Sequence, residues 1–194
     1  MRVFLDMDGV VADFMGGAMV LHGKPFPYDD PANRGDHGWG FDQSWGLPQA
    51  EFWAPMGYSF WADLPKTREA DAVVQLLSTA FGPNNVCFLT SPCHTPGCVE
   101  GKRDWVRRYY PQLPILFSVA SPDLDALPPK QFLAHNKSLL IDDHTPNVWS
   151  FREAGGVAYL FPRPWNRNWR KESVVVADLR SYVDDICQEE ACLL

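Results

Sequence analysis

The sequence predicts an α/β protein built on a parallel sheet of five strands, and three observations support that fold class. Short apolar runs alternate along the chain with stretches in which apolar residues recur at helical spacing. The short runs are apolar at nearly every position, which is typical of strands buried on both faces of a parallel sheet. Several of them end in Gly, Pro, Asp or Ser, so each is expected to pass into a loop.

The elements follow one another as strand and helix along most of the chain. The predicted strands occupy residues 2–10, 85–92, 114–119, 137–143 and 157–161. The predicted helices occupy residues 11–21, 66–81, 99–110, 147–154 and 174–190. Helix stops at Gly82-Pro83, Pro111 and Gly155-Gly156 support three of these ends. Right-handed crossovers are expected between the strands, so the carboxyl ends of the first, second and fourth should share one edge of the sheet.

Residues 23–64 differ in composition from the rest of the chain. They are rich in Pro, Gly and aromatic side chains, with one short helix predicted at 51–58. The tryptophans of this segment are Trp39, Trp45, Trp53 and Trp61. We expect a small, mainly helical cap with its own core, inserted after the first strand into a catalytic core of residues 1–22 and 65–194. For any single aromatic residue, packing inside the cap is the favoured explanation, but together they offer a flat face for a nucleobase.

Composition excludes some functional classes. The net charge is −7 and the pI is near 5.1, which argues against a partner of duplex nucleic acid, since such binders carry a basic footprint. No apolar stretch approaches the roughly 20 residues that span a bilayer, so no membrane association is expected. The first strand begins at once, where a leader would need a longer apolar region.

The cysteines indicate a reduced protein. They are odd in number, at positions Cys87, Cys93, Cys98, Cys187 and Cys192. Cys93, His94 and Cys98 lack a second pair of ligands at zinc-finger spacing, so a structural metal is disfavoured there. We therefore expect a cytoplasmic protein without disulfides. The oligomeric state is left open, with a homodimer as one alternative.

Two acidic pairs follow predicted strands. Asp6 and Asp8 end the first strand, and Asp142 and Asp143 end the fourth. Open α/β sheets bind ligands at the carboxyl ends of their strands, and close carboxylates need a cation or a shared proton to relieve their repulsion. Mg²⁺ prefers such oxygen ligands. A single Asp-x-Asp is a weak signal, because a solvated acidic turn has the same sequence.

These residues, taken in order, resemble the haloacid dehalogenase (HAD) superfamily, and in detail its 5'(3')-deoxyribonucleotidase branch. The resemblance rests on four ordered motifs, which cover nearly the whole chain. They are Asp6-Met7-Asp8-Gly9-Val10 with Ala12-Asp13-Phe14, Leu89-Thr90-Ser91-Pro92, Lys130, and Leu140-Ile141-Asp142-Asp143 followed by Pro146 and Asn147. The Trp105-Val106 pair also matches the branch. The resemblance implies a HAD-like, Rossmann-type fold of three layers and a Mg²⁺-dependent phosphomonoesterase that hydrolyses the 5'- or 3'-phosphate of deoxyribonucleoside monophosphates.

The resemblance, together with the chemistry of the side chains, implies roles for the acids. Asp6 is expected to be the nucleophile that forms an aspartyl-phosphate. Asp8 is expected to protonate the leaving oxygen and then to activate water, and also to contact substrate. The Asp6 carboxylate, the Asp8 carbonyl and Asp143 would hold Mg²⁺, with Asp142 supporting ligands or waters from behind.

The remaining catalytic and phosphate-binding groups follow in the same way. Thr90 and Ser91 would supply a hydroxyl and backbone N–H groups to the phosphate, although Thr-Ser-Pro is also a common strand-to-turn sequence. Lys130 would neutralise the phosphate and the aspartates. Lys102 is a rival for that role, but Lys130 shortly precedes the fourth strand, as the family's lysine does. We therefore assign Lys102 to a supporting position.

Substrate choice in the branch lies in the cap. Phe14 matches an aromatic residue that packs on the base, Trp53 resembles a second base platform, and Trp39 is a third candidate in a poorly aligned loop. His144 replaces an Arg, and His94 stands where a Lys is common, so the preferred base and phosphate position stay open. A phosphatase of another small ester or of a nucleic-acid end, and an inactive nucleotide-binding relative, are the alternatives; the intact motifs argue against the last.

Overall fold

The computed structural model describes residues 1–36, 40–118 and 129–191. Within these residues the strands form one sheet of five strands, ordered β3-β2-β1-β4-β5, in which every pairing is parallel. The strands are β1 (Arg2–Leu5), β2 (Val86–Thr90), β3 (Ile115–Phe117), β4 (Ser138–Asp142) and β5 (Val157–Leu160). The predicted α/β fold with a five-stranded parallel sheet is therefore confirmed.

Helices connect the strands and extend beyond their ends. The α-helices are α1 (Phe14–His22), α2 (Phe41–Ser44), α3 (Gln49–Trp53), α4 (Tyr58–Ala62), α5 (Ala70–Phe81), α6 (Cys98–Tyr109), α7 (Thr145–Glu153) and α8 (Val175–Ala191). Short 3₁₀ turns are η1 (Pro31–Asn33), η2 (Pro83–Asn85), η3 (Lys130–Leu133) and η4 (Trp169–Val174). The predicted helix at 51–58 is replaced by two short helices, α3 and α4, on either side of Pro55.

The sheet is covered on both faces. Successive side chains of a strand point to opposite faces, so strands that are apolar at nearly every position need packing on each side. In β1, Val3 and Leu5 join one apolar cluster, whereas Phe4 joins another. The first cluster takes helical residues from α5, α6 and α8 and also from α1, α3 and α4, and the second takes them from α7. The result is a three-layer arrangement in which both sides of the central strands are buried.

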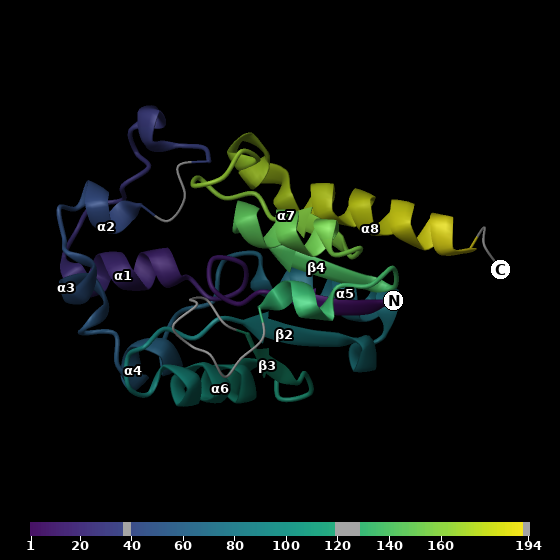
Figure 1. Cartoon of the computed structure of the whole chain (residues 1–194), viewed down its shortest axis with the longest axis horizontal. Coiled ribbons are helices and arrows are strands. Elements are labelled where there is room, and N and C mark those ends of the chain that lie inside the picture. Colours follow the sequence, from purple (N-terminus) through teal and green to yellow (C-terminus); the bar gives the residue numbers. More distant parts are fainter. Residues whose placement is uncertain (37–39, 119–128, 192–194) are drawn as a thin grey trace.

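The segment predicted to form a cap lies at the carboxyl end of the sheet. In Figure 1, α1, α2, α3 and α4 lie at the left, opposite the N-terminus from which β1 starts. The buried aromatic residues of this segment, Tyr28, Trp45, Phe52 and Trp61, belong to the same cluster as the core strands. The expectation of a separate small core is therefore wrong. The physical reason is close packing of α4 on α6, where a Cβ added to Gly101 would lie 2.7 Å from the Cβ atom of Trp61.

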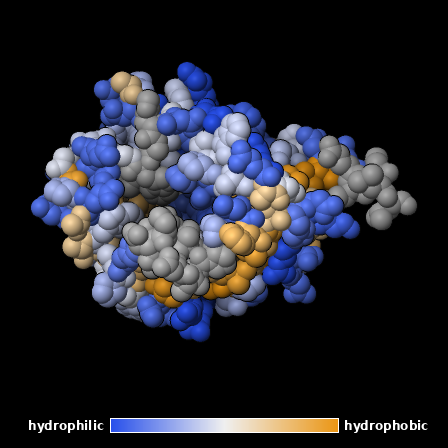
Figure 2. All heavy atoms as spheres, viewed as in Figure 1, coloured by the Kyte–Doolittle hydropathy of each residue, from blue (hydrophilic) through white to orange (hydrophobic). Residues whose placement is uncertain are grey.

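The surface is mainly polar on the face shown in Figure 2, where hydrophobic residues gather in a band along the lower side. Large apolar side chains that are exposed include Val20, Phe132 and Trp149. Among the described residues, no helix combines the length and the apolar character needed to cross a bilayer.

Candidate active site

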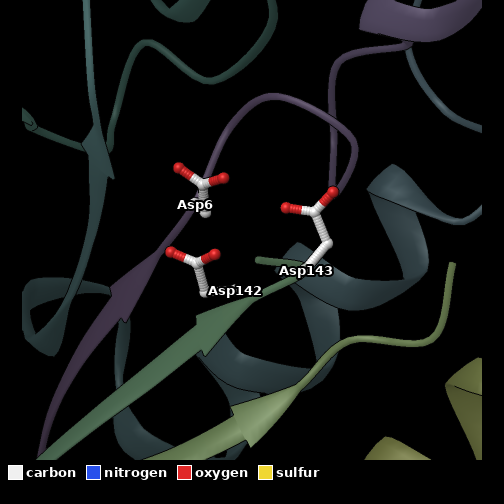
Figure 3. Close-up of side chains that lie close together, drawn as sticks. All are labelled: Asp6, Asp142 and Asp143. Carbon is white, nitrogen blue, oxygen red and sulfur yellow. The ribbon is translucent and has the colours of Figure 1, made fainter. Parts of the chain in front are cut away.

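The sheet order brings the predicted acids together. β1 lies between β2 and β4, so Asp6 after β1, Thr90 at the end of β2 and Asp142 at the end of β4 are neighbours at one edge. The backbone N–H of Asp6 donates to the carbonyl of Ile141 at 2.9 Å, which extends the β1–β4 pairing up to the site. Figure 3 shows the side chains of Asp6, Asp142 and Asp143 gathered beyond the ends of these two strands.

Three buried carboxylates form a group that could hold a cation. Asp6, Asp142 and Asp143 each offer an oxygen, and these oxygens lie within 4.8 Å of one another. The oxygens of Asp142 are engaged by protein donors: Oδ1 accepts from the backbone of His144 at 2.8 Å, and Oδ2 accepts from Asn147 at 3.0 Å. In contrast, Oδ1 of Asp143 is buried and has no hydrogen-bond partner among the described residues. An all-oxygen donor set with an unpartnered carboxylate oxygen suits a hard divalent cation.

Lys130 lies between two of these carboxylates. Its Nζ donates to Oδ1 of Asp6 at 2.6 Å and to Oδ2 of Asp142 at 2.7 Å, and the side chain is 3% exposed. The lysine reaches this position from η3, twelve residues before Asp142. Its ammonium therefore compensates part of the negative charge at the end of β1 and β4.

The electrostatics of the group are those of crowded acids in a buried site. Burial raises the pKa of Asp6 to about 7, although the Lys130 ammonium acts in the opposite direction, and Asp142 and Asp8 raise it further. Burial, followed by the charges of Asp6 and Asp142, raises the pKa of Asp143 well above its usual range. Burial opposes the charged form of Lys130, but Asp142 and Asp6 outweigh it and raise its pKa. An additional positive charge would reduce the repulsion between these carboxylates and favour their charged forms.

Lys102 is also part of the site, more directly than the sequence indicated. It is fully buried, and its Nζ donates to Oδ2 of Asp8 at 2.5 Å, to Oγ1 of Thr90 at 2.9 Å and to the carbonyl of Ser91 at 2.8 Å. The ammonium lies 4.7 Å from the ring centroid of Trp61. Lys102 thus joins the loops after β1 and β2, while Oδ1 of Asp8 stays buried and unpartnered among the described residues.

A tight turn carries the chain from Asp6 to α1. The backbone N–H groups of Val11 and Ala12 both donate to the carbonyl of Met7 at 2.9 Å. Gly9 has φ 74°, a left-handed conformation that favours glycine, and a Cβ there would overlap Oδ2 of Asp143. Asp13 then caps α1 by accepting from the backbone of Gly16 at 2.9 Å. Gly9 is therefore needed for both the turn and the close approach of Asp143.

Residues 162–166, which follow β5, are buried next to this turn. Trp165 donates to Oδ2 of Asp143 at 2.7 Å, and Asn166 donates to the Asp143 carbonyl at 2.9 Å. Arg163 is 5% exposed and donates to the carbonyl of Gly9. The signal that could have found these residues is the concentration of Arg, Trp and Asn directly after the fifth strand, although composition does not give their partners.

The residues predicted to bind a nucleobase differ from one another in burial. Phe14 is 2% exposed, and its ring is nearly parallel to those of Trp61 (5.5 Å between centroids, 10°) and Trp53 (5.9 Å, 24°). A ligand could not contact Phe14 without displacing part of this aromatic cluster. Trp53 is half-buried and keeps an accessible part. Trp39 lies outside the described residues.

The two histidines that depart from the family pattern also differ in setting. His94 is exposed. His144 lies directly after the acidic pair, and burial lowers its pKa, which favours the neutral ring. A neutral ring would not supply the fixed positive charge of the Arg that the resemblance leads one to expect at this position.

Comparisons with known proteins add little to this geometry. No protein-family model matches the chain, and no curated protein matches it. Among solved structures, the chain is similar to a HAD-superfamily hydrolase from Ehrlichia chaffeensis. That match has 11% sequence identity and a TM-score of 0.44, and it covers 95% of this chain and 96% of the other. Similarity at that level supports no inference about activity.

Proposed function

We propose that the chain is a Mg²⁺-dependent phosphomonoesterase that hydrolyses deoxyribonucleoside monophosphates through an aspartyl-phosphate. The observation that carries the proposal is that two buried lysines pair with the acids at one edge of the sheet. Lys130 contacts Asp6 and Asp142, and Lys102 contacts Asp8. Buried charges are costly unless they are paired and hydrogen-bonded. Phosphoryl transfer requires a nucleophile, an acid and positive charge in one place.

The metal would be held by Asp143 and Asp6, with the backbone carbonyl of Asp8 as the further ligand that the family resemblance implies. Oδ1 of Asp143, which has no hydrogen-bond partner in the described part of the chain, supports this assignment. Asp142 would support the metal site without binding the cation itself, because both of its oxygens already accept hydrogen bonds from the protein. When bound, the cation would neutralise charge on the phosphoryl oxygens. Nucleophilic attack, proton transfer and phosphate binding would be carried out by groups of the protein itself.

Asp6 would attack the phosphorus with a carboxylate oxygen, forming the Asp6 O–P bond as the bond from phosphorus to the sugar oxygen breaks. The leaving oxygen would take its proton from Asp8, whose buried Oδ1 has no partner among the described residues and is therefore available for this contact. In the second step Asp8 would take a proton from water as the water attacks phosphorus. Inorganic phosphate then leaves and the Asp6 carboxylate is regenerated.

Positive and neutral donors would bind the phosphate. Lys130 would stabilise charge that develops near Asp6. Thr90 accepts a hydrogen bond from Lys102, so its own hydroxyl proton is left to donate to a phosphate oxygen. Backbone N–H groups after Ser91 would complete the phosphate site. The thiols of Cys87, Cys93 and Cys98 form no disulfide among the described residues, which supports the cytoplasmic location that belongs to this proposal.

The nucleotide assignment rests on the family resemblance and on the aromatic cluster of Phe14, Phe52, Trp53, Phe60 and Trp61 beside the site. This cluster reaches the catalytic groups through the contact of Trp61 with Lys102. One observation favours a second candidate, a phosphatase of another small ester: Phe14 is almost fully buried and is not presented to a base. Phosphate release from deoxynucleotides, ribonucleotides and sugar phosphates separates the two, and a preference for sugar phosphates would reject the nucleotide assignment.

Trp53→Ala is expected to lower kcat/KM selectively for a deoxynucleotide. Trp53 is half-buried, and loss of a base platform costs about 1–3 kcal/mol of base binding, or roughly 5- to 150-fold. The comparison substrate is p-nitrophenyl phosphate, which has no nucleobase and should lose little. Trp149→Ala is a suitable control, because Trp149 is an exposed indole on α7. Equal losses for both substrates, with a lower Tm, would show that Trp53 only packs the cluster.

A further inference from the structure

The segment after β5 holds Asp143 at two points. The indole N–H of Trp165 donates to Oδ2 at 2.7 Å, and the Asn166 side chain donates to the Asp143 carbonyl at 2.9 Å. Asn166 also donates to the carbonyl of Phe161 at 2.8 Å, which ties it to the end of β5. Both the backbone and one carboxylate oxygen of Asp143 are therefore fixed by neighbouring residues of a single loop.

The indole hydrogen bond engages only one oxygen of the Asp143 carboxylate, Oδ2. Oδ1 is buried and unpartnered in the part of the chain that the structure describes. A buried carboxylate oxygen without a hydrogen-bond partner is unfavourable, and a bound cation would offset that cost. The indole hydrogen bond thus fixes the rotation of the carboxylate and determines which oxygen is presented toward Asp6 and Asp142.

The Trp165 ring is itself firmly placed. It is 5% exposed, packs 5.7 Å from Tyr28 between ring centroids, and lies where a Cβ on Gly9 would be 2.9 Å from its Cζ2 atom. Gly9 is held in turn by Arg163, whose guanidinium also contacts Glu69 at 3.3 Å. The loop after β5 therefore contacts both acid-bearing segments of the site, the turn after β1 and the end of β4.

We propose that Trp165 is a positioning residue that orients the Asp143 carboxylate for a divalent cation. The proposal rests on the metal-dependent function proposed above, which it deepens by assigning a residue that the sequence motifs do not include. Donors behind a metal-ligating side chain set its orientation, and their loss typically costs 10- to 100-fold in metal affinity. A structural indole needs only a backbone acceptor, as Trp105 has in the carbonyl of Leu64 at 2.7 Å.

The test is the affinity of the purified protein for Mg²⁺, measured by calorimetric titration without substrate. Trp165→Phe keeps an aromatic ring in the cavity and removes the N–H, so its Kd for Mg²⁺ should rise about 10- to 100-fold. Trp105→Phe is the matched control, because it also removes a buried indole donor. This control should lose thermal stability and keep the Kd of the unchanged protein.

The outcomes separate the two proposals. Mg²⁺ binding by Trp165→Phe as tight as that of the unchanged protein would overturn the positioning role and leave the proposed function standing. Absence of Mg²⁺ binding by the unchanged protein would overturn the metal-dependent function itself. If Trp165→Phe does not fold, benzothienylalanine at position 165 preserves the shape of the indole and removes the same N–H, and the same shift in Kd is expected.

Discussion

Asp6→Asn is expected to abolish phosphate release, with a loss of at least about a thousandfold in kcat, or roughly 4 kcal/mol at about 1.4 kcal/mol per tenfold. The amide keeps the shape of the side chain but cannot attack phosphorus as a carboxylate does. It also removes the negative charge from one of the three residues whose carboxylate oxygens lie within 4.8 Å of one another. The measurement is inorganic phosphate released from a deoxynucleoside monophosphate by the pure, folded variant.

The fold should survive this change. Lys130 keeps its contact with Asp142, and the backbone hydrogen bond from residue 6 to Ile141 does not involve the side chain. Near-native circular dichroism together with lost turnover is therefore expected. Asp184→Asn, an exposed carboxylate on α8, provides a control of the same chemistry that should keep full activity. Turnover by Asp6→Asn close to that of the unchanged protein would contradict the covalent mechanism.

Lys130→Met should reduce both stability and activity. Methionine fills the space of the aliphatic stem, but Asp6 and Asp142 lose the ammonium that contacts both of them at 2.6 and 2.7 Å. Removing one partner of a buried ion pair typically costs about 3–5 kcal/mol, because the remaining charge is left uncompensated. Urea unfolding at pH 7 measures the first effect, and kcat/KM measures the second.

Lys171→Met is the matched control for this prediction. Lys171 pairs with Asp178 at 2.9 Å, but it is 53% exposed and lies on the surface next to α8. An exposed pair of this kind contributes about 0–1 kcal/mol, so this variant should change little. Unfolding free energies that fall equally in the two variants would show that Lys130 is an ordinary ion-pair partner, without a special position between two carboxylates.

The sheet and its acidic edge could be predicted because their signals are local. Apolar strands of four or five residues, each ended by a polar group, define β1, β2 and β4 without any long-range information. Asp6 and Asp142 then fall at the carboxyl ends by position alone. Crossover connections make neighbouring strands parallel, so their carboxyl ends lie at the same edge of the sheet.

Element boundaries were predicted less well where distant segments compete for the backbone. The first helix was predicted from Val11 but begins at Phe14, because Val11 and Ala12 donate to Met7 in the turn instead. The next long helix was predicted from Lys66 but begins at Ala70, since Thr67 donates to the carbonyls of Val10 and Val11. Both differences come from the turn that presents the acids.

Long-range partners could not be predicted at all. Arg163 and Glu69 form a buried pair across 94 positions, and Lys102 reaches Asp8 across the same separation. Sequence spacing gives no register for such contacts. Lys102 was consequently assigned a supporting position, although three of its hydrogen bonds lie within the site.

The decisive measurement for a metal-dependent phosphatase is phosphate release from a deoxynucleoside monophosphate with and without Mg²⁺. The buried acids of Asp6, Asp142 and Asp143 require a cation for the chemistry proposed here. After exhaustive treatment with EDTA, activity should fall to background, and added Mg²⁺ should restore it while Ca²⁺ should not. Full activity in the chelated protein, or no phosphate release in the presence of Mg²⁺, would contradict the account.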